Sequence, residues 1–357
     1  MKGLILAGGS GTRLRPLTHT GPKQLIPIAN KPNILYCLED LRDAGITDIG
    51  IILGDNMPEK VQSLLGDGSE YGVNITYIVQ GEPRGIAHAV GCAEEFMDGE
   101  PFVVYLGDNI LKGGVRYMAE EFQSDGMEAM VALCRVDHPE KFGIAELDEE
   151  GHILSLEEKP KEPRSDLALI GIYFLRESIF QVIRGLEPSW RNELEITDAI
   201  DELRRTRGGV KAMEVKGWWK DTGKPDDILT ANHLVLDDVE GDMQGRMEEG
   251  VRLIGRVKVG KGTVLREGTV VRGPAIIGED CDIGPRSYIG PYTSIGDRCS
   301  LRGGEIESSI VMEDGTIECS EKIVDSLIGG GCSITPSDDR LPKGYRLVIG
   351  ENSRLLL

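Results

Sequence analysis

The N-terminal stretch MKGLILAGGSGTRLRPLT (1–18) contains the features that decide the fold of the first part of the chain. Its segment GLILA (3–7) is a compact apolar run, typical of a buried β-strand, and the loop GGSG (8–11) follows it directly. A glycine-rich loop at the carboxyl end of a parallel strand can bring several backbone N–H groups onto one phosphate, because no side chain holds the phosphate away. The stretch therefore predicts a first strand followed by a phosphate-binding loop.

Two common phosphate-binding loops do not fit this stretch. A dinucleotide-binding fingerprint that starts at Gly9 needs a glycine at position 14, which is Leu14, and no GK[ST] follows as in a Walker loop. Basic residues come instead, with Arg13 inside the loop and Lys23 ten residues later. A glycine loop with two nearby cations suits the triphosphate of a nucleotide, although GGSG alone also fits a plain turn.

Short apolar runs and helical patterns alternate through the rest of the first 235 residues. Strands are expected at 48–53, 75–79, 102–106, 129–135, 153–157 and 168–174. Helices are expected at 34–44, 58–65, 86–96 and about 197–205. This alternation is typical of a Rossmann-like α/β domain, with a mostly parallel sheet that helices cover on both faces.

A six-residue repeat replaces this pattern after the acidic segment 236–250, which we expect to be a linker. Val, Ile or Leu occupies every sixth position nine times in a row, from Leu253 to Leu301, and the register then slips. Stacked turns of a coil place such residues inside, one above another. The repeat predicts a left-handed parallel β-helix over 251–357, as a domain separate from 1–235.

The composition excludes several classes of function. Asp and Glu number 60 against 40 Lys and Arg, and the formal net charge of −20 argues against a nucleic acid or an anionic membrane surface as partner. No apolar run approaches the ~20 residues of a membrane span, and the N-terminus lacks the long apolar core of a signal peptide. Seven scattered cysteines without a CxxC pair fit a reducing compartment. We therefore expect a cytoplasmic protein.

Acidic and basic residues stand where predicted strands end. Asp108 follows an apolar run, and a carboxylate at that place suits Mg²⁺, which keeps several waters and also binds substrate phosphates. Asp221 is a candidate for a second carboxylate. Glu158 can accept hydrogen bonds from sugar hydroxyls, and Lys159 can hold a phosphate. Considered singly, each of these residues also fits a turn or a solvated surface.

Gln80 and Gly85 flank a short polar loop after another predicted strand. A glutamine side chain presents one donor and one acceptor, which match the N3–H and the adjacent carbonyl of thymine or uracil. A surface loop glutamine is the alternative.

Taken together, these motifs resemble the signature of the sugar-1-phosphate nucleotidyltransferases. Within that family the chain is similar to the glucose-1-phosphate thymidylyltransferases in the long form that ends in a hexapeptide β-helix. The resemblance covers essentially all 357 residues. The motifs that carry it are GGSGTRLRPLT (8–18), PKQLIPIANKP (22–32), QGEPRGIAHA (80–89), YLGDN (105–109), LEEKP (156–160), ELEITD (193–198) and WKDTG (219–223).

The resemblance implies a nucleotidyltransferase domain over 1–235 and assigns roles to particular residues. The implied catalytic residues are Arg13, Lys23 and Lys159. The implied nucleotide-binding residues are Leu6, Gly8, Gly9, Gly11, Thr12, Gln80 and Gly85. The implied sugar-phosphate-binding residues are Gly143, Glu158, Lys159, Ile170 and Glu193, and Asp108 and Asp221 would bind Mg²⁺.

The implied reaction joins dTTP and glucose 1-phosphate to give dTDP-glucose and pyrophosphate, for deoxysugar synthesis of the rhamnose type. The alternatives are a UTP-dependent uridylyltransferase acting on glucose or N-acetylglucosamine 1-phosphate, a bifunctional enzyme whose coil also transfers an acetyl group, and a regulatory or structural subunit with an inactive site. The intact set of basic and acidic residues argues against the inactive subunit. We also expect a homo-oligomer, either trimer-based or a tetramer, because β-helices of this type commonly associate side by side.

Overall fold

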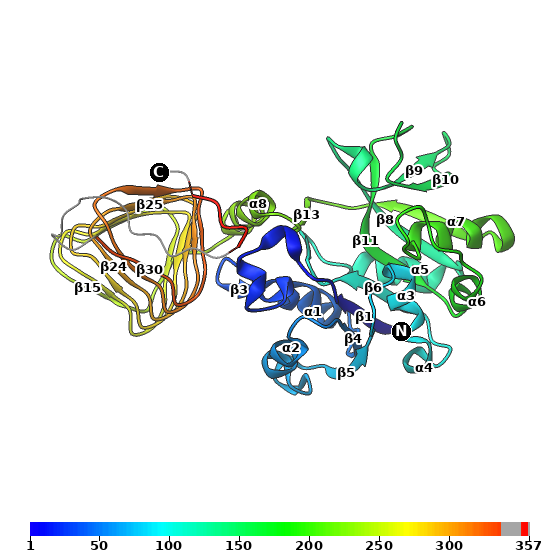
Figure 1. Cartoon of the computed structure of the whole chain (residues 1–357), viewed down its shortest axis with the longest axis horizontal. Coiled ribbons are helices and arrows are strands. Elements are labelled where there is room, and N and C mark those ends of the chain that lie inside the picture. Colours follow the sequence, from blue (N-terminus) through cyan, green and yellow to red (C-terminus); the bar gives the residue numbers. More distant parts are fainter. Residues whose placement is uncertain (337–350, 356–357) are drawn as a thin grey trace. The chain divides into compact units, whose positions relative to one another are not determined.

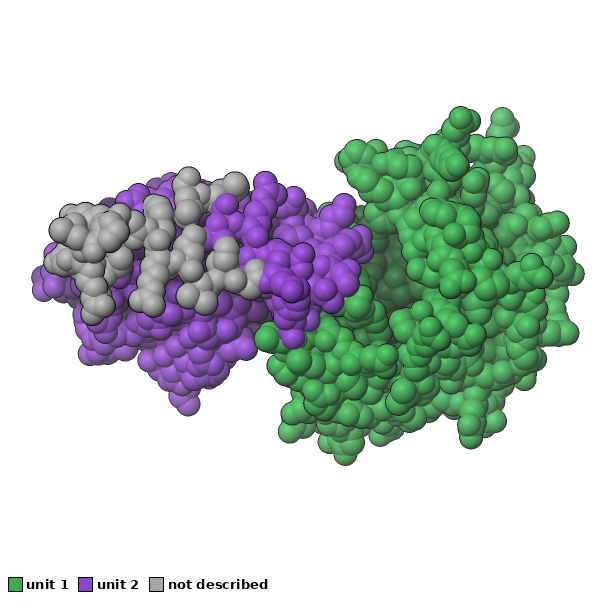
Figure 2. Space-filling model, viewed as in Figure 1, with its two compact units in different colours: residues 1–11, 20–25, 33–221 green, residues 12–19, 26–32, 222–357 purple. Residues whose placement is uncertain are grey.

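A computed structural model describes residues 1–336 and 351–355. Two compact units make up the chain (Figure 2). The first comprises residues 1–11, 20–25 and 33–221, and the second comprises residues 12–19, 26–32 and 222–357. Two short segments near the N-terminus therefore group with the C-terminal part, which the sequence pattern did not indicate. The functional division into 1–235 and 251–357 stays a prediction.

A nine-stranded mixed sheet forms the centre of the first unit (Figure 1). Four of its strands run parallel, in the order β5 (Asn74–Val79), β4 (Asp48–Leu53), β1 (Lys2–Ala7) and β6 (Phe102–Leu106). The sheet continues with β11 (Leu167–Leu175), which is antiparallel to β6, and with β8 (Ala129–Arg135), β9 (Gly143–Leu147), β10 (Ile153–Glu158) and β12 (Val210–Glu214). The expected Rossmann-like α/β architecture is confirmed, with the all-parallel part ending at β6.

Helices cover both faces of this sheet (Figure 1). One face carries α1 (Asn33–Asp43), α2 (Pro58–Leu65) and α5 (Arg116–Ser124), and the other carries α3 (Ile86–Gly91), α4 (Glu94–Met97), α6 (Ser178–Arg184) and α7 (Ile196–Arg207). Successive strand residues point to opposite faces, so Leu4 packs in one apolar cluster and Ile5 in the other, both fully buried. Burial on two faces removes more apolar surface from water than a one-sided sheet could.

The helix expected at 86–96 is two helices, α3 and α4. The N–H of Ala93 bonds to the carbonyl of Val90, only three residues back, and this tighter turn interrupts the α-helical ladder. Single turns also occur at η3 (Lys23–Leu25), η4 (Ser69–Tyr71) and η5 (Pro139–Lys141). Within residues 1–336 and 351–355, no helix has the length and apolar character that crossing a membrane requires.

A small two-stranded sheet joins distant parts of the first unit. It consists of β7 (Asn109–Leu111) and β13 (Trp219–Asp221), which run antiparallel. The pairing sets Asp221 directly opposite Asn109. It therefore brings the WKDTG motif to the end of β6.

Three parallel sheets form a β-helix in the second unit (Figure 1). The first sheet contains β14 (Asp242–Met243), β17 (Val257–Val259), β20 (Ala275–Ile277), β23 (Thr293–Ile295), β26 (Ile310–Val311) and β29 (Leu327–Ile328). The second contains β15 (Arg246–Met247), β18 (Val264–Leu265), β21 (Asp282–Ile283), β24 (Ser300–Arg302), β27 (Thr316–Glu318) and β30 (Ser333–Ile334). The third contains β16 (Arg252–Ile254), β19 (Val270–Arg272), β22 (Tyr288–Ile289), β25 (Glu305–Glu307) and β28 (Lys322–Val324).

The length of one coil turn explains the slip in the repeat. Ile283 pairs with Leu301, which is 18 residues later, whereas Leu301 pairs with Ile317, which is only 16 residues later. The repeat aliphatics from Val259 to Leu301 are buried inside the coil, so the expected β-helix is confirmed. Strands β14 and β15 already belong to it, although they lie within 236–250, the segment expected to be a linker.

The second unit also contains η1 (Thr12–Leu14), η2 (Leu17–His19), β2 (Pro27–Ile28), β3 (Lys31–Pro32) and α8 (Pro225–Leu236). A buried asparagine joins α8 and the β2–β3 hairpin to the coil. Asn232 in α8 is fully buried, and its Oδ1 accepts hydrogen bonds from the N–H of Ala29 (2.8 Å) and from Oγ of Ser294 (2.7 Å). Its Nδ2 donates to the carbonyl of Tyr292 (3.1 Å). One side chain thus fastens the β2–β3 hairpin and α8 to the coil.

Candidate active site

Three neighbouring strands of the first unit are each followed by a glycine at the carboxyl end. Gly8 follows β1, Gly54 follows β4 and Gly107 follows β6. A Cβ added at Gly54 would lie 3.0 Å from the Cα of Gly8, and a Cβ added at Gly107 would lie 3.0 Å from the carbonyl oxygen of Leu6. Gly9 has a φ of 106°, which favours glycine. The predicted nucleotide residues Leu6 and Gly8 therefore lie where neighbouring backbones approach closely, and Gly9 follows them in the loop.

An ion pair between Lys23 and Asp108 lies beside this glycine loop. Nζ of Lys23 contacts Oδ2 of Asp108, and Nδ2 of Asn109 donates to Oδ1 of the same carboxylate (3.0 Å). A Cβ added at Gly9 would lie 4.0 Å from Cε of Lys23. Burial raises the pKa of Asp108, but the Lys23 ion pair and these hydrogen bonds outweigh it and hold the pKa below its usual value. Asp108 is therefore ionised at neutral pH and paired with a cation.

Asp221 reaches the same place through the β7–β13 pairing. It lies opposite Asn109, the residue after Asp108, and Nε1 of Trp219 donates to Oδ1 of Asn109 (2.6 Å). The fold thus brings two carboxylates into neighbouring positions from strands that are far apart in the sequence. Carboxylate oxygens suit a hard divalent cation, and Asp108 already holds one cationic group, the ammonium of Lys23. These residues fit a divalent metal ion.

Gln80 follows β5 and also lies beside the glycine loop. A Cβ added at Gly8 would lie 2.9 Å from Oε1 of Gln80. Nε2 of Gln80 donates to the carbonyl of Gly85 (3.3 Å) and contacts Nδ1 of His88 (3.3 Å). The amide therefore presents its oxygen toward the glycine loop and its nitrogen toward α3.

Gly85 packs against the backbone of a second loop at Leu194. The N–H of Leu194 donates to the carbonyl of Arg84 (2.7 Å), and the N–H of Ala87 donates to the carbonyl of Leu194 (3.0 Å). Gly85 has a φ of 103°, and a Cβ added there would lie 2.4 Å from the carbonyl oxygen of Leu194. Only glycine fits this position, which joins the Gln80 loop to the loop before α7.

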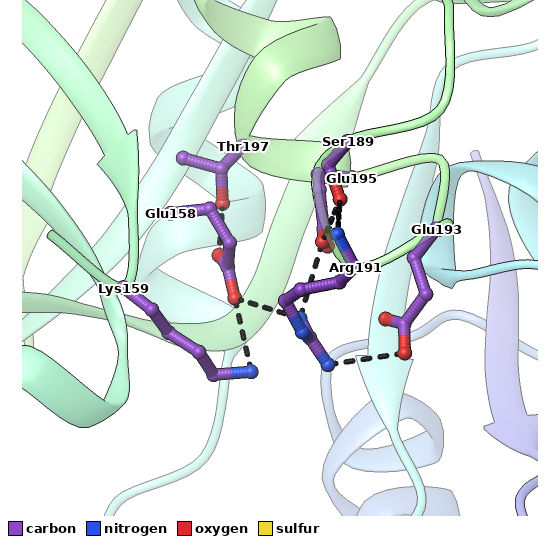
Figure 3. A network of polar contacts seen from close by, with 7 residues as sticks. All are labelled: Glu158, Lys159, Ser189, Arg191, Glu193, Glu195 and Thr197. Carbon is purple, nitrogen blue, oxygen red and sulfur yellow. Dashed lines mark hydrogen bonds and ion pairs between the residues drawn. The ribbon is translucent and has the colours of Figure 1, made fainter.

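A cluster of charged side chains lies at the end of β10 (Figure 3). Glu158 is the last residue of β10 and pairs with Gly143 in β9. Oε2 of Glu158 accepts a hydrogen bond from Oγ1 of Thr197 (2.8 Å), and Oε1 lies 3.3 Å from Nζ of Lys159. A Cβ added at Gly143 would lie 3.0 Å from Oε2 of Glu158, so glycine leaves the space that the carboxylate occupies.

Arg191 joins this cluster to the loop before α7 (Figure 3). Its Nη1 donates to Glu195 Oε1 (3.1 Å) and to Glu158 Oε1 (3.4 Å), and its Nη2 donates to Glu193 Oε1 (3.0 Å). Oγ of Ser189 donates to the same oxygen of Glu195 (2.9 Å). Burial raises the pKa of Glu195, although the hydrogen bond from Ser189 opposes this. One guanidinium thus holds three carboxylates together.

The remaining predicted residues lie in other surroundings. Ile170 is in β11, and its side chain is fully buried in the apolar cluster that includes α1 and α5. Gly11 ends the first segment of the first unit, with a φ of 59°. Thr12 and Arg13 belong to η1 of the second unit, and both side chains are exposed.

Several polar residues of this site were not predicted from the sequence, among them Gln24, Asn109, Arg191 and Thr197. Gln24 is 1% exposed, and its Nε2 donates to the carbonyl of Gly8 (3.1 Å), whereas its Oε1 has no hydrogen-bond partner among the described residues. Asn109 and Thr197 each donate a hydrogen bond to a predicted carboxylate. Gln24, Asn109 and Thr197 lie inside sequence motifs of the family, and Arg191 lies two residues before the motif ELEITD. Their position in or near a motif is the sequence feature that could have identified them.

The contact between Gly85 and Leu194 gives a test of the local packing. We expect Gly85→Ala to lower the free energy of unfolding at least twice as much as Gly208→Ala, which should cost about 1–3 kcal/mol for the strained backbone alone. Gly208 is the matched control because its φ of 72° and ψ of −160° lie in the same glycine-favouring region as those of Gly85 (103° and 173°), but nothing lies within 4 Å of an added Cβ. Urea unfolding followed by the fluorescence of the three tryptophans, all in the first unit, measures both. Equal effects would show that the two loops do not pack tightly.

Comparisons with known proteins show the family to which this chain belongs. Residues 2–238 match the family model described as nucleotidyl transferase. Over 357 residues, the chain is 53% identical to the low-salt glycan biosynthesis nucleotidyltransferase Agl11 of Haloferax volcanii, with 100% of each chain covered. It is 46% identical to a glucose-1-phosphate thymidylyltransferase of Streptomyces antibioticus, with 99% of each chain covered.

A solved structure described as a glucose-1-phosphate thymidylyltransferase from Bacillus anthracis, in complex with sucrose, is 42% identical. Its TM-score is 0.63, and the match covers 68% of this chain and 98% of that one. Enzymes of the matched family generally use a divalent metal ion, which the two carboxylates at the end of β6 and in β13 suit. The family match over residues 2–238 and the full-length relatives show that this chain belongs to the nucleotidyl transferase family.

Proposed function

We propose that this chain joins dTTP and glucose 1-phosphate to give dTDP-glucose and pyrophosphate. The observation that carries the proposal is the cluster around Arg191, in which Glu158 and Glu193 offer oxygens for sugar hydroxyls beside the ammonium of Lys159. The similarity over nearly the whole chain to a protein named glucose-1-phosphate thymidylyltransferase supports these two substrates.

The reaction needs positioning and charge neutralisation rather than a covalent intermediate on the enzyme. An oxygen of the sugar phosphate attacks the α-phosphorus of the nucleotide, the bond from that phosphorus to the bridging oxygen breaks, and pyrophosphate leaves. Lys159 orients the attacking phosphate and Lys23 holds the leaving pyrophosphate, a role that the family resemblance also implies for Arg13. Each cation offsets charge that grows as the bond breaks.

Asp108 and Asp221 would hold Mg²⁺, which supplies further charge neutralisation at the transferred phosphate. Lys23 pairs with Asp108 in the structure, so Lys23 has to turn toward the triphosphate when the nucleotide binds. Such an exchange keeps the buried Asp108 carboxylate beside a cation in both states. That matters because a buried charge left without a partner is strongly destabilising, by about 3–5 kcal/mol.

Gln80 reads the base in this proposal. Its Oε1, which faces the glycine loop, can accept the N3–H of thymine. Uracil offers the same pattern and differs by one methyl group, worth only about 1–3 kcal/mol of discrimination in a pocket. UTP is therefore the alternative nucleotide, and the experiment below separates the two.

The β-helix serves assembly rather than catalysis in this proposal. Two of its apolar side chains are well exposed on the third sheet, Ile254 in β16 (39%) and Val324 in β28 (48%). Because β16 and β28 are the first and last strands of that sheet, these two side chains lie apart, and the proposed assembly rests on the common side-by-side association of β-helices of this type. The coil would then join copies of the chain into a trimer-based assembly or a tetramer, while residues 1–235 carry out the reaction.

The substrates are tested by an activity matrix of dTTP, UTP and dCTP against the 1-phosphates of glucose, galactose and N-acetylglucosamine, read as pyrophosphate release. We expect the highest kcat/KM for dTTP with glucose 1-phosphate. Gln80→Ala should raise the KM for dTTP about tenfold and leave the KM for glucose 1-phosphate unchanged, because the lost contacts are worth about 1–3 kcal/mol. Gln62→Ala, on the exposed side of α2, is the matched control. A higher kcat/KM for another pair, or a Gln80→Ala variant with the wild-type KM for dTTP, would contradict the proposal.

The two carboxylates are tested by Asp108→Asn and Asp221→Asn, which keep the shape and remove one negative charge. We expect each to lower kcat at least ~100-fold, as for the loss of one preorganised electrostatic contact. The double variant should be little worse than either single one, because both residues act through one ion. Asp98→Asn, an exposed carboxylate at the end of α4, should have no effect. Near wild-type turnover in either single variant, or full activity in excess chelator, would refute the shared site.

The role of the coil is tested by two measurements on the full-length protein. We expect no acetyl transfer from acetyl-CoA to glucosamine 1-phosphate, because residues 234–357 contain no histidine to act as general base. Light scattering after size exclusion should show an oligomer. Acetyl-CoA turnover would contradict the first expectation, and a strictly monomeric protein would contradict the second.

A further inference from the structure

We propose that His88 is a positioning residue that fixes the orientation of the Gln80 amide and so makes the site select thymine or uracil over cytosine. The proposal rests on the proposed role of Gln80 in reading the base. His88 lies in α3, within the motif QGEPRGIAHA, and its side chain is half-buried. Its Nδ1 lies 3.3 Å from Nε2 of Gln80.

The nitrogen and the oxygen of the Gln80 amide face different groups. Both of its hydrogen-bond contacts use Nε2, one to the carbonyl of Gly85 and one to Nδ1 of His88, each at 3.3 Å. A carbonyl oxygen only accepts, so the group that faces Gly85 has to be the NH₂ group. The second hydrogen of Nε2 then points to His88, and Oε1 is left facing Gly8 and the glycine loop.

The contact needs a neutral His88 with its proton on Nε2. In that tautomer Nδ1 is an acceptor for the Gln80 amide, and the Nε2–H points toward Sγ of Cys92, which lies 4.0 Å away. Burial lowers the pKa of His88, Arg84 lowers it further, and Glu82 opposes them. The helices that pack against α3, which are α6 and α7, contribute apolar residues of the same core cluster, such as Ile183. His88 is therefore neutral at pH 7.

The orientation of the amide decides which base is complementary. With Oε1 toward the glycine loop, Gln80 accepts the N3–H of thymine or uracil. Cytosine has a lone pair at N3 and an amino group next to it, so it requires the reversed amide. A protonated His88 carries a hydrogen on Nδ1 and no longer accepts from Nε2, which leaves Gly85 alone to hold the amide. The preference for thymine should therefore weaken as the pH falls through the pKa of His88.

Two variants of His88 test this assignment. His88→Leu removes the acceptor, and we expect it to raise the KM for dTTP about five- to tenfold, the effect of one hydrogen bond, with no change in the KM for glucose 1-phosphate. The ratio of kcat/KM for dTTP over dCTP should fall with it. His88→Asn keeps an acceptor at this position but cannot titrate, so it should keep the wild-type KM at pH 7.5.

The pH dependence of the ratio of kcat/KM for dTTP over dCTP distinguishes a positioning role of His88 from a role in packing. In the wild type we expect the dTTP-over-dCTP ratio to be constant above about pH 6.5, the ordinary histidine value, and to fall below it. The ratio is the suitable readout because both nucleotides carry the same triphosphate. In His88→Asn the ratio should stay level across the range. His152 is an exposed histidine in the β9–β10 turn, and His152→Asn is the control. This variant should show the same pH dependence of the ratio as the wild type.

The outcomes distinguish failure of this assignment from failure of the proposed function. A wild-type KM for dTTP in a folded His88→Leu, together with an impaired Gln80→Ala, overturns the role of His88 alone. If the dTTP-over-dCTP ratio still falls at low pH in His88→Asn, the role of His88 is also overturned, even if His88→Leu does not fold. If Gln80→Ala itself keeps the wild-type KM for dTTP, the base-reading role of Gln80 is wrong, and the assignment of His88 falls with it.

Discussion

The close approach of three strand ends is the constraint on which the site depends. Gly8, Gly54 and Gly107 leave the carboxyl ends of β1, β4 and β6 without side chains, and an added Cβ at any of them would lie within about 3 Å of a neighbouring atom. Because the backbones come so close, Gln80 after β5 and Asp108 after β6 are brought to either side of one loop. A larger residue at these positions would displace a backbone or the Gln80 amide, and with it the placement of the functional groups.

The site contains paired cations although the chain as a whole has an excess of acidic residues. The chain has a formal net charge of −20, yet its predicted phosphate-binding lysines, Lys23 and Lys159, are each paired with a carboxylate, Asp108 and Glu158. These pairs keep each carboxylate beside a cation before a substrate arrives, which avoids a poorly solvated charge without a partner. Arg191 does the same for three carboxylates at once. An anionic substrate bound by these lysines, as proposed, would have to compete with the carboxylates for the cations.

The second unit fixes segments that flank a predicted catalytic residue in the chain. Residues 12–19 and 26–32 belong with α8 and the β-helix, whereas residues 20–25, which contain Lys23, belong to the first unit. The buried Asn232 bonds the hairpin to the coil through Ala29 and Ser294, and removing a buried polar partner of this kind costs about 1–3 kcal/mol. Residues on both sides of Lys23 in the chain therefore belong to the second unit, although Lys23 itself belongs to the first.

The sequence alone determined the elements whose signal is local. The period of six fixed the β-helix, because an aliphatic residue recurs at the same inward position of each turn, and the apolar run before the glycine loop fixed the first strand. The tertiary structure alone decided which distant polar groups meet. The pairing of β13 with β7 set Asp221 opposite Asn109, and the loop before α7 brought Arg191 to Glu158. Such contacts leave no periodicity in the sequence, since they depend on strand register and loop path. The same holds for the grouping of 12–19 and 26–32 with the coil, and for the contact of His88 with Gln80.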